Sequence, residues 1–183
     1  GEMTYFRLGS MHNIHYYLNL MKQARAAILE DNWDEFKKEF TVKVLGQSVQ
    51  GKPIYHVKLG TGKIKILAWS QMHGNEATTT KAVFDIFNTL KMGKDQLAIK
   101  SILKNCTLHI IPILNPDGVI NGNYRCSLSG QDLNRRWKNP SKILHPVIFS
   151  VKKLMRSFSK ERECALYVDL HGHSRRKNIF MYG

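Results

Sequence analysis

The sequence has 183 residues, of which 43% are hydrophobic, a length and composition that suit one folded domain with a core and argue against disorder. It contains no apolar run of about 18 residues or more, so no membrane-spanning helix is expected. Twenty-eight Lys and Arg residues stand against 14 Asp and Glu residues, and the net charge of +14 favours acidic partners such as nucleic acid, anionic lipid or acidic peptide, with a well-solvated basic surface as the alternative.

Three segments carry apolar residues at the spacing of an amphipathic helix. The first helix is predicted within 11–29, the second within 76–90 and the third within 147–158. The predicted buried stripe of the second helix is Ala82, Val83, Ile86, Phe87 and Leu90.

Strand patterns lie between these helices. Three short strands separated by glycine-containing turns are predicted within 40–70, and further apolar runs occupy 106–114 and 165–170. Since strands alternate with helices and are apolar on both faces, the fold class is α/β, with a mixed, mainly parallel sheet and helices on both faces. No repeat or linker interrupts the chain, so residues 1–183 are predicted to form a single domain.

The three cysteines are scattered along the chain. Cys106, Cys126 and Cys164 are odd in number and form no Cys-x-x-Cys pair. This favours reduced thiols in a cytosolic protein and argues against a zinc site built from thiolates.

Polar side chains follow three of the predicted strands at the point where each strand ends. These are His73 with Glu76 in "MHGNE", Asn115 with Asp117 in "NPDG", and His171 with His173 in "DLHGHS". In open α/β sheets, ligands bind beyond the carboxyl ends of the strands, so the three clusters are expected to meet at one edge of the sheet.

Two of these clusters contain residues that suit a metal ion. His73 and Glu76 are three positions apart at the entry to a predicted helix and therefore share one face. His171 adds a third ligand, and three protein ligands leave the fourth zinc position open for water, as in catalytic sites. His173 is the competing candidate, because residues two apart in an extended chain point the same way.

The segment "NYRCSLSGQDLNRRW" is the second informative stretch. It combines Arg125, Arg135 and Arg136 with Asp132 and Asn134 in a polar, turn-rich setting. The planar guanidinium suits a carboxylate, and a further arginine near a metal stabilises a developing oxyanion. The alternative is a solvated basic loop.

Six motifs in order together resemble the zinc carboxypeptidase family, the funnelin-type metallocarboxypeptidases: "GQSVQGKPIYHVKLG", "HGNE", "NPDGV", "NYRCS", "QDLNRRW" and "DLHGHS". The resemblance implies that one zinc ion is bound by His73, Glu76 and His171. Carboxypeptidase A itself uses a set of two histidines and one glutamate.

The same resemblance assigns roles in the polar segment. It implies that Arg125 polarises the scissile carbonyl, that Asn134 and Arg135 bind the terminal carboxylate of the substrate, and that Asp132 orients the first zinc histidine. Members of the family usually read Asn-Arg-Asn where this chain has Asn134-Arg135-Arg136.

Within the family, the part of the chain after Leu114 looks like the cytosolic carboxypeptidases, which trim glutamates from protein termini and side chains, notably on tubulin. This likeness implies a cytoplasmic enzyme that acts on peptide or protein C-termini, including acidic tails. The part up to Leu114 looks more like bacterial members, so a divergent member and a composite of two sources are the alternatives. The β-sandwich domain of the cytosolic enzymes has no counterpart here.

No Asp or Glu follows Asp169, whereas the family's catalytic glutamate lies well after the third zinc ligand. The chain is therefore expected to be an incomplete catalytic domain with little turnover in isolation. The alternatives are a zinc-binding module that recognises acidic tails without cleaving them and a zinc amidase of N-acyl amino acids. A nucleic-acid binder is supported by charge alone, since no recognised motif for it is present.

Overall fold

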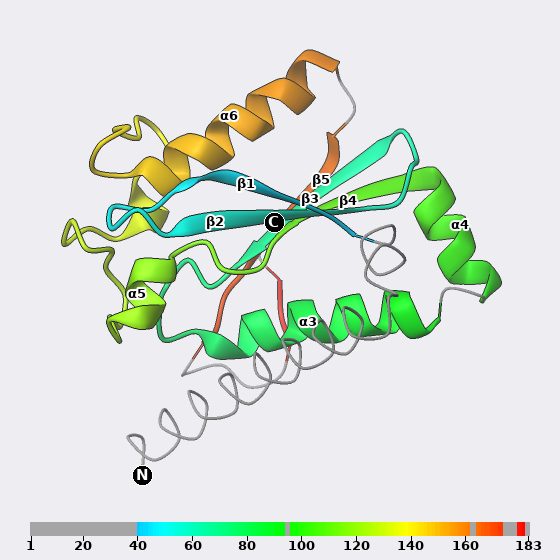
Figure 1. Ribbon diagram of the computed structural model, residues 1–183, viewed down its shortest axis with the longest axis horizontal. Helices are drawn as coiled ribbons and strands as arrows, with labels where there is room; N and C mark the ends of the chain where they lie inside the picture. Colours follow the sequence, from blue (N-terminus) through cyan, green and yellow to red (C-terminus); the bar gives the residue numbers. More distant parts are fainter. Residues whose placement is uncertain (1–39, 94–95, 162–163, 174–178, 182–183) are drawn as a thin grey trace, which may run out of the picture.

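The computed structural model describes residues 40–93, 96–161, 164–173 and 179–181. The helix predicted within 11–29 lies outside these residues. The described chain forms a five-stranded sheet in the order β1-β2-β4-β3-β5, with helices on both of its faces (Figure 1). This is the predicted α/β architecture.

The strands are β1 (Thr41–Gln47), β2 (Pro53–Leu59), β3 (Ile64–Ser70), β4 (Cys106–Ile111) and β5 (Cys164–Leu170). Strands β4, β3 and β5 run parallel, and β2 pairs antiparallel with both β1 and β4. The sheet is therefore half parallel and half antiparallel in its pairings, and the parallel half brings the carboxyl ends of β3, β4 and β5 to one edge.

Strands β1 and β2 form an antiparallel hairpin whose turn is stabilised locally. Gly51 has φ of 73°, a conformation that favours glycine, and its N–H donates to the carbonyl of Ser48 at 3.0 Å. The hydroxyl of Ser48 donates to Asp117 at 2.6 Å, and Asp117 also accepts from the N–H of Gln50 at 3.2 Å. The turn is thereby tied to the short helix α5 (Pro116–Ile120).

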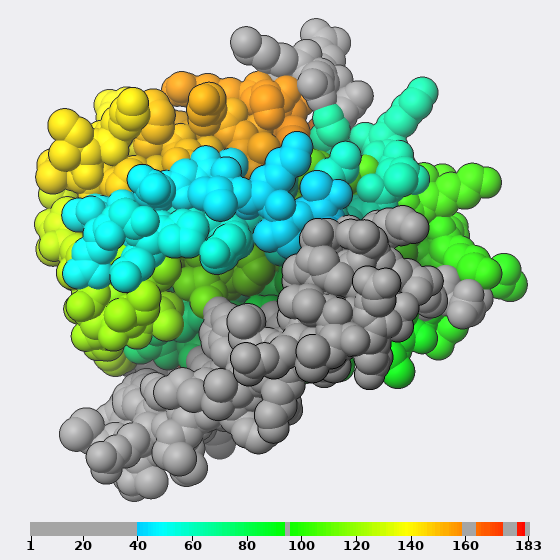
Figure 2. Space-filling model, in the orientation of Figure 1, coloured from blue at the N-terminus to red at the C-terminus, as the bar shows by residue number. Residues whose placement is uncertain are grey.

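One face of the sheet is covered by α6 (Pro146–Glu161), which lies over β1 (Figures 1 and 2). Buried residues of α6 share a core with the sheet because its apolar side chains recur every three or four positions. The members of this core from the helix are Val147, Ile148, Val151 and Phe158, and those from the strands are Ile54, Leu67, Trp69 and Ile111.

The opposite face is covered by α3 (Ala77–Met92) and α4 (Leu97–Asn105) (Figure 1). A second core lies here, formed by Val57, Leu59, Val83, Leu90, Ile99 and Ile110. None of the helices in the described part of the chain is both long enough and apolar enough to cross a membrane.

The predicted stripe of α3 is partly wrong. Val83 and Leu90 are buried and Phe87 packs against the second core, but Ala82 is exposed and Ile86 is 43% exposed. The first turn explains the difference, because it is the polar Thr79 and Thr80 that face the sheet.

The prediction that the last strand is buried is also wrong. Among the described residues, strand β5 pairs with β3 on one side only, and Leu166 and Tyr167 are 51% and 39% exposed. An edge strand has one neighbour in the sheet, so less of its surface is covered. The prediction of a strand within 165–170 is nevertheless confirmed.

Candidate metal centre

The end of β3 turns sharply to deliver His73. Gln71 adopts φ of 49°, which is rare for a residue other than glycine. Its strained backbone is held on several sides: its N–H donates to Thr79 Oγ1 at 3.3 Å, its Nε2 donates to the carbonyl of Gly74 at 2.9 Å, and its Oε1 accepts from Thr80 Oγ1 at 2.5 Å. Strain of this kind persists only where the surroundings impose it, and it often marks a functional site.

Strand β4, which pairs with β3, is followed by a residue that supports the same turn. The side chain of Asn115, just beyond β4, donates to the carbonyl of Met72 at 3.2 Å and accepts from the N–H of Gly118 at 2.9 Å. Asn115 thus fixes the backbone next to His73, as its place at a strand end suggested. Its neighbour Asp117 points away, toward Ser48, and does not join the cluster.

Gly74 occupies a position where no larger residue fits. A Cβ atom there would lie 2.5 Å from the carbonyl oxygens of both Gly118 and Asn123. This close backbone approach lets the chain pass from His73 to Glu76, the residue before α3, within three positions.

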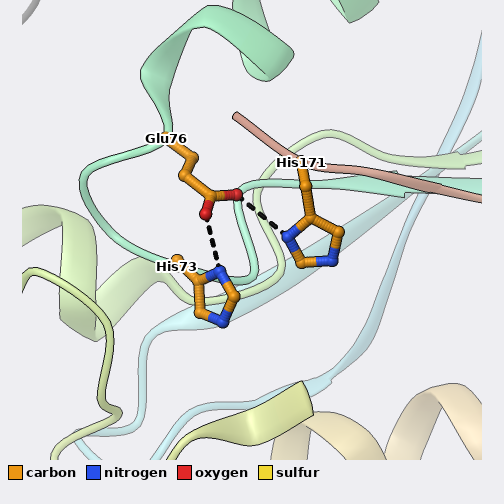
Figure 3. Close-up of side chains that lie close together, drawn as sticks. All are labelled: His73, Glu76 and His171. Atoms are coloured by element: carbon orange, nitrogen blue, oxygen red, sulfur yellow. Dashed lines mark hydrogen bonds and ion pairs between the residues drawn. The ribbon is translucent and has the colours of Figure 1, made fainter. Parts of the chain in front are cut away.

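Three side chains converge at this edge: His73, Glu76 and His171 (Figure 3). The carboxylate of Glu76 lies between the two rings, with Oε1 2.8 Å from Nδ1 of His73 and Oε2 3.0 Å from Nδ1 of His171. Oε2 also accepts from the N–H of Gly172 at 3.0 Å. One ligand atom from each residue lies within 4.8 Å of the others.

The cluster combines buried and open sides. The side chains of His73 and Glu76 are 2% and 10% exposed, whereas that of His171 is 28% exposed. Two imidazole nitrogens and a carboxylate are donors that zinc accepts, and an open side leaves room for a further ligand. The donor set therefore fits a zinc ion, with both histidines offering Nδ1.

The hydrogen bonds of the cluster shift the pKa values of Glu76 and His171. Burial raises the pKa of Glu76, but hydrogen bonds from His171, His73 and the N–H of Gly172 outweigh it and lower the pKa to about 2. The hydrogen bond to Asp169, and then that to Glu76, raises the pKa of His171 to about 9 against the opposing effect of burial. The carboxylate of Glu76 is therefore charged at neutral pH.

Asp132 lies behind the first histidine. Its Oδ1 is 3.1 Å from Nε2 of His73, and its Oδ2 accepts from Nε of Arg125 at 2.8 Å. Asp132 also caps the short helix η1 (Leu133–Arg135), where Oδ1 accepts from the N–H of Asn134 at 2.9 Å. Burial raises the pKa of Asp132, and the bonds from His73, Asn134 and Arg125 lower it by more.

The other predicted residues of the polar segment lie around Asp132. The side chain of Arg125 is 46% exposed, and Arg135 is exposed. Asn134 Oδ1 accepts from Nε1 of Trp137 at 3.2 Å, and this bond holds its side chain toward Trp137.

His173 lies outside the cluster. Its ring packs edge-on against Phe180 with centroids 5.4 Å apart, and the group of possible metal ligands found among the described residues contains His171 in its place. Of the two candidates from "DLHGHS", His171 is the one that lies beside His73 and Glu76.

Asp169 contacts His171, and this contact was not among the sequence predictions. Its Oδ2 lies 3.0 Å from Nε2 of His171. The signal for it was present in the strand, because residues 169 and 171 point to the same side of an extended chain.

Comparison with known proteins gives a consistent result. The family profile described as zinc carboxypeptidase matches residues 26–183. A profile for queuine tRNA-ribosyltransferase matches residues 1–45, almost all of them outside the described structure, and this short match shows no second family.

The curated relatives are cytosolic carboxypeptidases. Cytosolic carboxypeptidase 1 of Xenopus laevis is 46% identical over 131 residues, which cover 70% of this chain and 10% of that protein. Cytosolic carboxypeptidase 2 of Xenopus tropicalis is 34% identical over 179 residues, which cover 91% of this chain and 18% of that protein. The chain therefore spans less than a fifth of either relative, and the second match includes residues on both sides of Leu114.

Solved structures show the same fold. The metallo-carboxypeptidase from Burkholderia cenocepacia superposes with a TM-score of 0.68 and 27% identity, over 74% of this chain and 37% of that one. Since the family profile covers most of the sequence, including all the residues of the described cluster, the chain belongs to the zinc carboxypeptidase family.

Proposed function

We propose that His73, Glu76 and His171 hold one zinc ion per chain, and that the chain is part of the single catalytic domain of a metallocarboxypeptidase that removes C-terminal residues from peptides or proteins. The observation that carries the proposal is the convergence of both Nδ1 atoms on the Glu76 carboxylate, at 2.8 and 3.0 Å. A bound zinc ion supplies Lewis acidity to a carbonyl oxygen and lowers the pKa of a water.

Arg125 is the proposed group for the scissile carbonyl. Its Nε bonds Asp132 at 2.8 Å, which uses one of the five N–H donors of the guanidinium and orients the rest of the group. Since Asp132 also contacts His73 at 3.1 Å, Arg125 is linked to the proposed metal ligand through a single carboxylate.

Asn134 and Arg135 are the proposed groups for the terminal carboxylate of the substrate. Both belong to η1, which Asp132 caps, so their backbone positions are set by the same residue that contacts His73. An arginine fork suits a carboxylate because it donates two parallel hydrogen bonds.

The proposed substrates are acidic C-termini, including glutamate-rich tails such as those of tubulin, and the proposed location is the cytoplasm. The net charge of +14 attracts acidic chains, and the curated relatives are named cytosolic carboxypeptidases.

Metal analysis of the purified chain tests the site. Wild type is expected to bind one zinc per chain, whereas His73→Ala and His171→Ala bind substoichiometric zinc. His173→Ala is the matched control, because it removes an exposed histidine two positions from His171 and should keep full stoichiometry. Full stoichiometry in His171→Ala would refute the ligand assignment, and zinc loss only in His173→Ala would transfer the role to that residue.

Cleavage of peptides that carry a free or an amidated C-terminus tests the reaction. A carboxypeptidase needs the free carboxylate, so the amidated peptide should not be cleaved. Binding of the free peptide without any cleavage, by the zinc-loaded chain and by a longer parent chain alike, would favour the non-catalytic module.

A further inference from the structure

We propose that Asp169 is a positioning residue for His171: its carboxylate accepts a hydrogen bond from the Nε2–H of the ring and so holds the ring with Nδ1 directed at the proposed metal position. The inference rests on the proposed metal site and adds a residue to it. The proposed effect of Asp169 is on zinc affinity. Asp169 contacts His171, and its described contacts include neither Glu76 nor His73.

The geometry comes from the strand itself. Asp169 lies opposite Trp69 in the pairing of β5 with β3, and His171 follows two positions later, immediately after the strand ends. Because alternate residues of a strand share a face, the backbone places both side chains on the same side without a turn between them. Asp169 Oδ2 and His171 Nε2 lie 3.0 Å apart, which is hydrogen-bonding distance.

The two histidines of the cluster are held in the same way. Each ring points Nδ1 at the Glu76 carboxylate, and each places Nε2 on a second carboxylate, Asp132 for His73 at 3.1 Å and Asp169 for His171 at 3.0 Å. The two supporting carboxylates come from unrelated parts of the fold, one from a helix cap and one from a strand. A histidine that binds a metal through one nitrogen commonly donates its other N–H to a carboxylate, which fixes the tautomer and the ring orientation.

The need for such support is greater at His171 than at His73. His73 has a 2% exposed side chain and is confined by its surroundings, whereas the side chain of His171 is 28% exposed and lies at the end of an edge strand. An exposed ring has more rotamers to lose when it binds a metal, so a partner that holds it beforehand contributes to affinity.

The same geometry argues against Asp169 as a general base. Its carboxylate lies at Nε2, on the side of the His171 ring away from Nδ1 and the Glu76 carboxylate. A base must reach the water that it deprotonates, and Asp169 is placed to act through the ring of His171 instead.

The test is the dissociation constant for zinc, measured by competition with a chromophoric chelator on the 183-residue chain. Asp169→Ala is expected to weaken zinc binding about 10- to 100-fold, the usual effect of removing such a partner. Asp169→Asn should remain within a few-fold of wild type, because its amide oxygen still accepts the Nε2–H bond. Asp85→Ala, which removes an exposed carboxylate on α3, is the matched control for net charge and should bind zinc like wild type.

Melting temperatures of the metal-free variants separate positioning from a structural role. If Asp169→Ala binds zinc as tightly as wild type, or if Asp85→Ala weakens it equally, the proposal is wrong. It is also wrong if the variant melts so much lower without metal that unfolding accounts for the whole loss. If His73→Ala and His171→Ala leave the dissociation constant unchanged, the proposed metal site itself fails, and this result is distinct from failure of Asp169 alone.

Discussion

Nε2 of His56 lies 2.9 Å from Nδ1 of His109, and the two rings stack with their centroids 5.0 Å apart. The residues face each other across the neighbouring strands β2 and β4, and both are buried. The Nε2 atom of His109 has no hydrogen-bond partner among the described residues, and the ring of Phe158 from α6 packs against it with centroids 4.6 Å apart. The pair is therefore a neutral, partly unsatisfied element of the core.

This pair should make the fold sensitive to acid. Burial, and then the charges of His56, Lys58 and Lys65, lower the pKa of His109 to about 4 from an unfolded value near 6.5. Between pH 6.5 and pH 4 the unfolded chain therefore binds more protons than the folded chain, and the free energy of unfolding falls as the pH falls.

His109→Asn isolates this contribution. The variant keeps a polar atom near Nδ1 but cannot titrate, so it should be less stable than wild type at pH 7 and lose less stability between pH 7 and pH 5. Urea unfolding at the two pH values measures both quantities. Equal losses in the two proteins would show that His109 does not resist protonation in the fold.

Asp117 should matter for stability and not for metal. It is 2% exposed and joins α5 to the β1–β2 turn through the hydroxyl of Ser48 and the N–H of Gln50. Asp117→Ala leaves both donors without their acceptor, which costs about 1–3 kcal/mol. We expect a lower free energy of unfolding with an unchanged zinc dissociation constant.

The control for this change is Asp85→Ala, which removes a carboxylate from an exposed position and should alter stability by less than about 0.5 kcal/mol. A large loss of zinc affinity in Asp117→Ala would mean that the predicted grouping of Asn115 and Asp117 with the metal cluster was right after all.

Gly74 and Gly172 should respond differently to alanine. A Cβ at Gly74 would lie 2.5 Å from two backbone carbonyl oxygens, whereas a Cβ at Gly172 would meet the flexible side chain of Glu76 at 3.3 Å. Gly74→Ala should therefore lower both stability and zinc affinity, while Gly172→Ala leaves the fold intact and shifts Glu76 slightly. Thermal unfolding without metal and zinc titration measure the two effects, and equal stability of the two variants would contradict the backbone clash.

The convergence of His73, Glu76 and His171 could be predicted because two of the three residues follow a simple rule. His73 and His171 end parallel strands that lie side by side, so their side chains meet at one edge. The sequence favoured His171 over His173 because His171 directly follows the apolar run. In the structure, Nδ1 of His171 contacts the Glu76 carboxylate, whereas the ring of His173 packs against Phe180.

Other features depended on packing that no periodicity shows. Helix α4 was not predicted, because Ile99 is its only buried residue and Leu97 is 85% exposed. On α3, Thr80 is buried and its hydroxyl contacts Gln71 Oε1 and the carbonyl oxygen of Pro112; Phe84, one turn later, is also buried, whereas Ile86 is 43% exposed. Polar contacts of this kind override the apolar pattern.

The last prediction concerns the charge of the substrate. The zinc-loaded chain should bind peptides ending in Glu more tightly than otherwise identical peptides ending in Leu or Lys, because the chain carries a net charge of +14. Charges on a surface are screened over about 8 Å at physiological ionic strength, so the preference should shrink as salt is raised. Arg135→Ala should weaken all three peptides alike, since the proposed role of Arg135 is to bind the terminal carboxylate that they share. Fluorescence anisotropy at two salt concentrations measures these affinities. A preference for Glu that salt does not change would indicate a specific pocket for the side chain, and equal affinities at low salt would contradict acidic selectivity altogether.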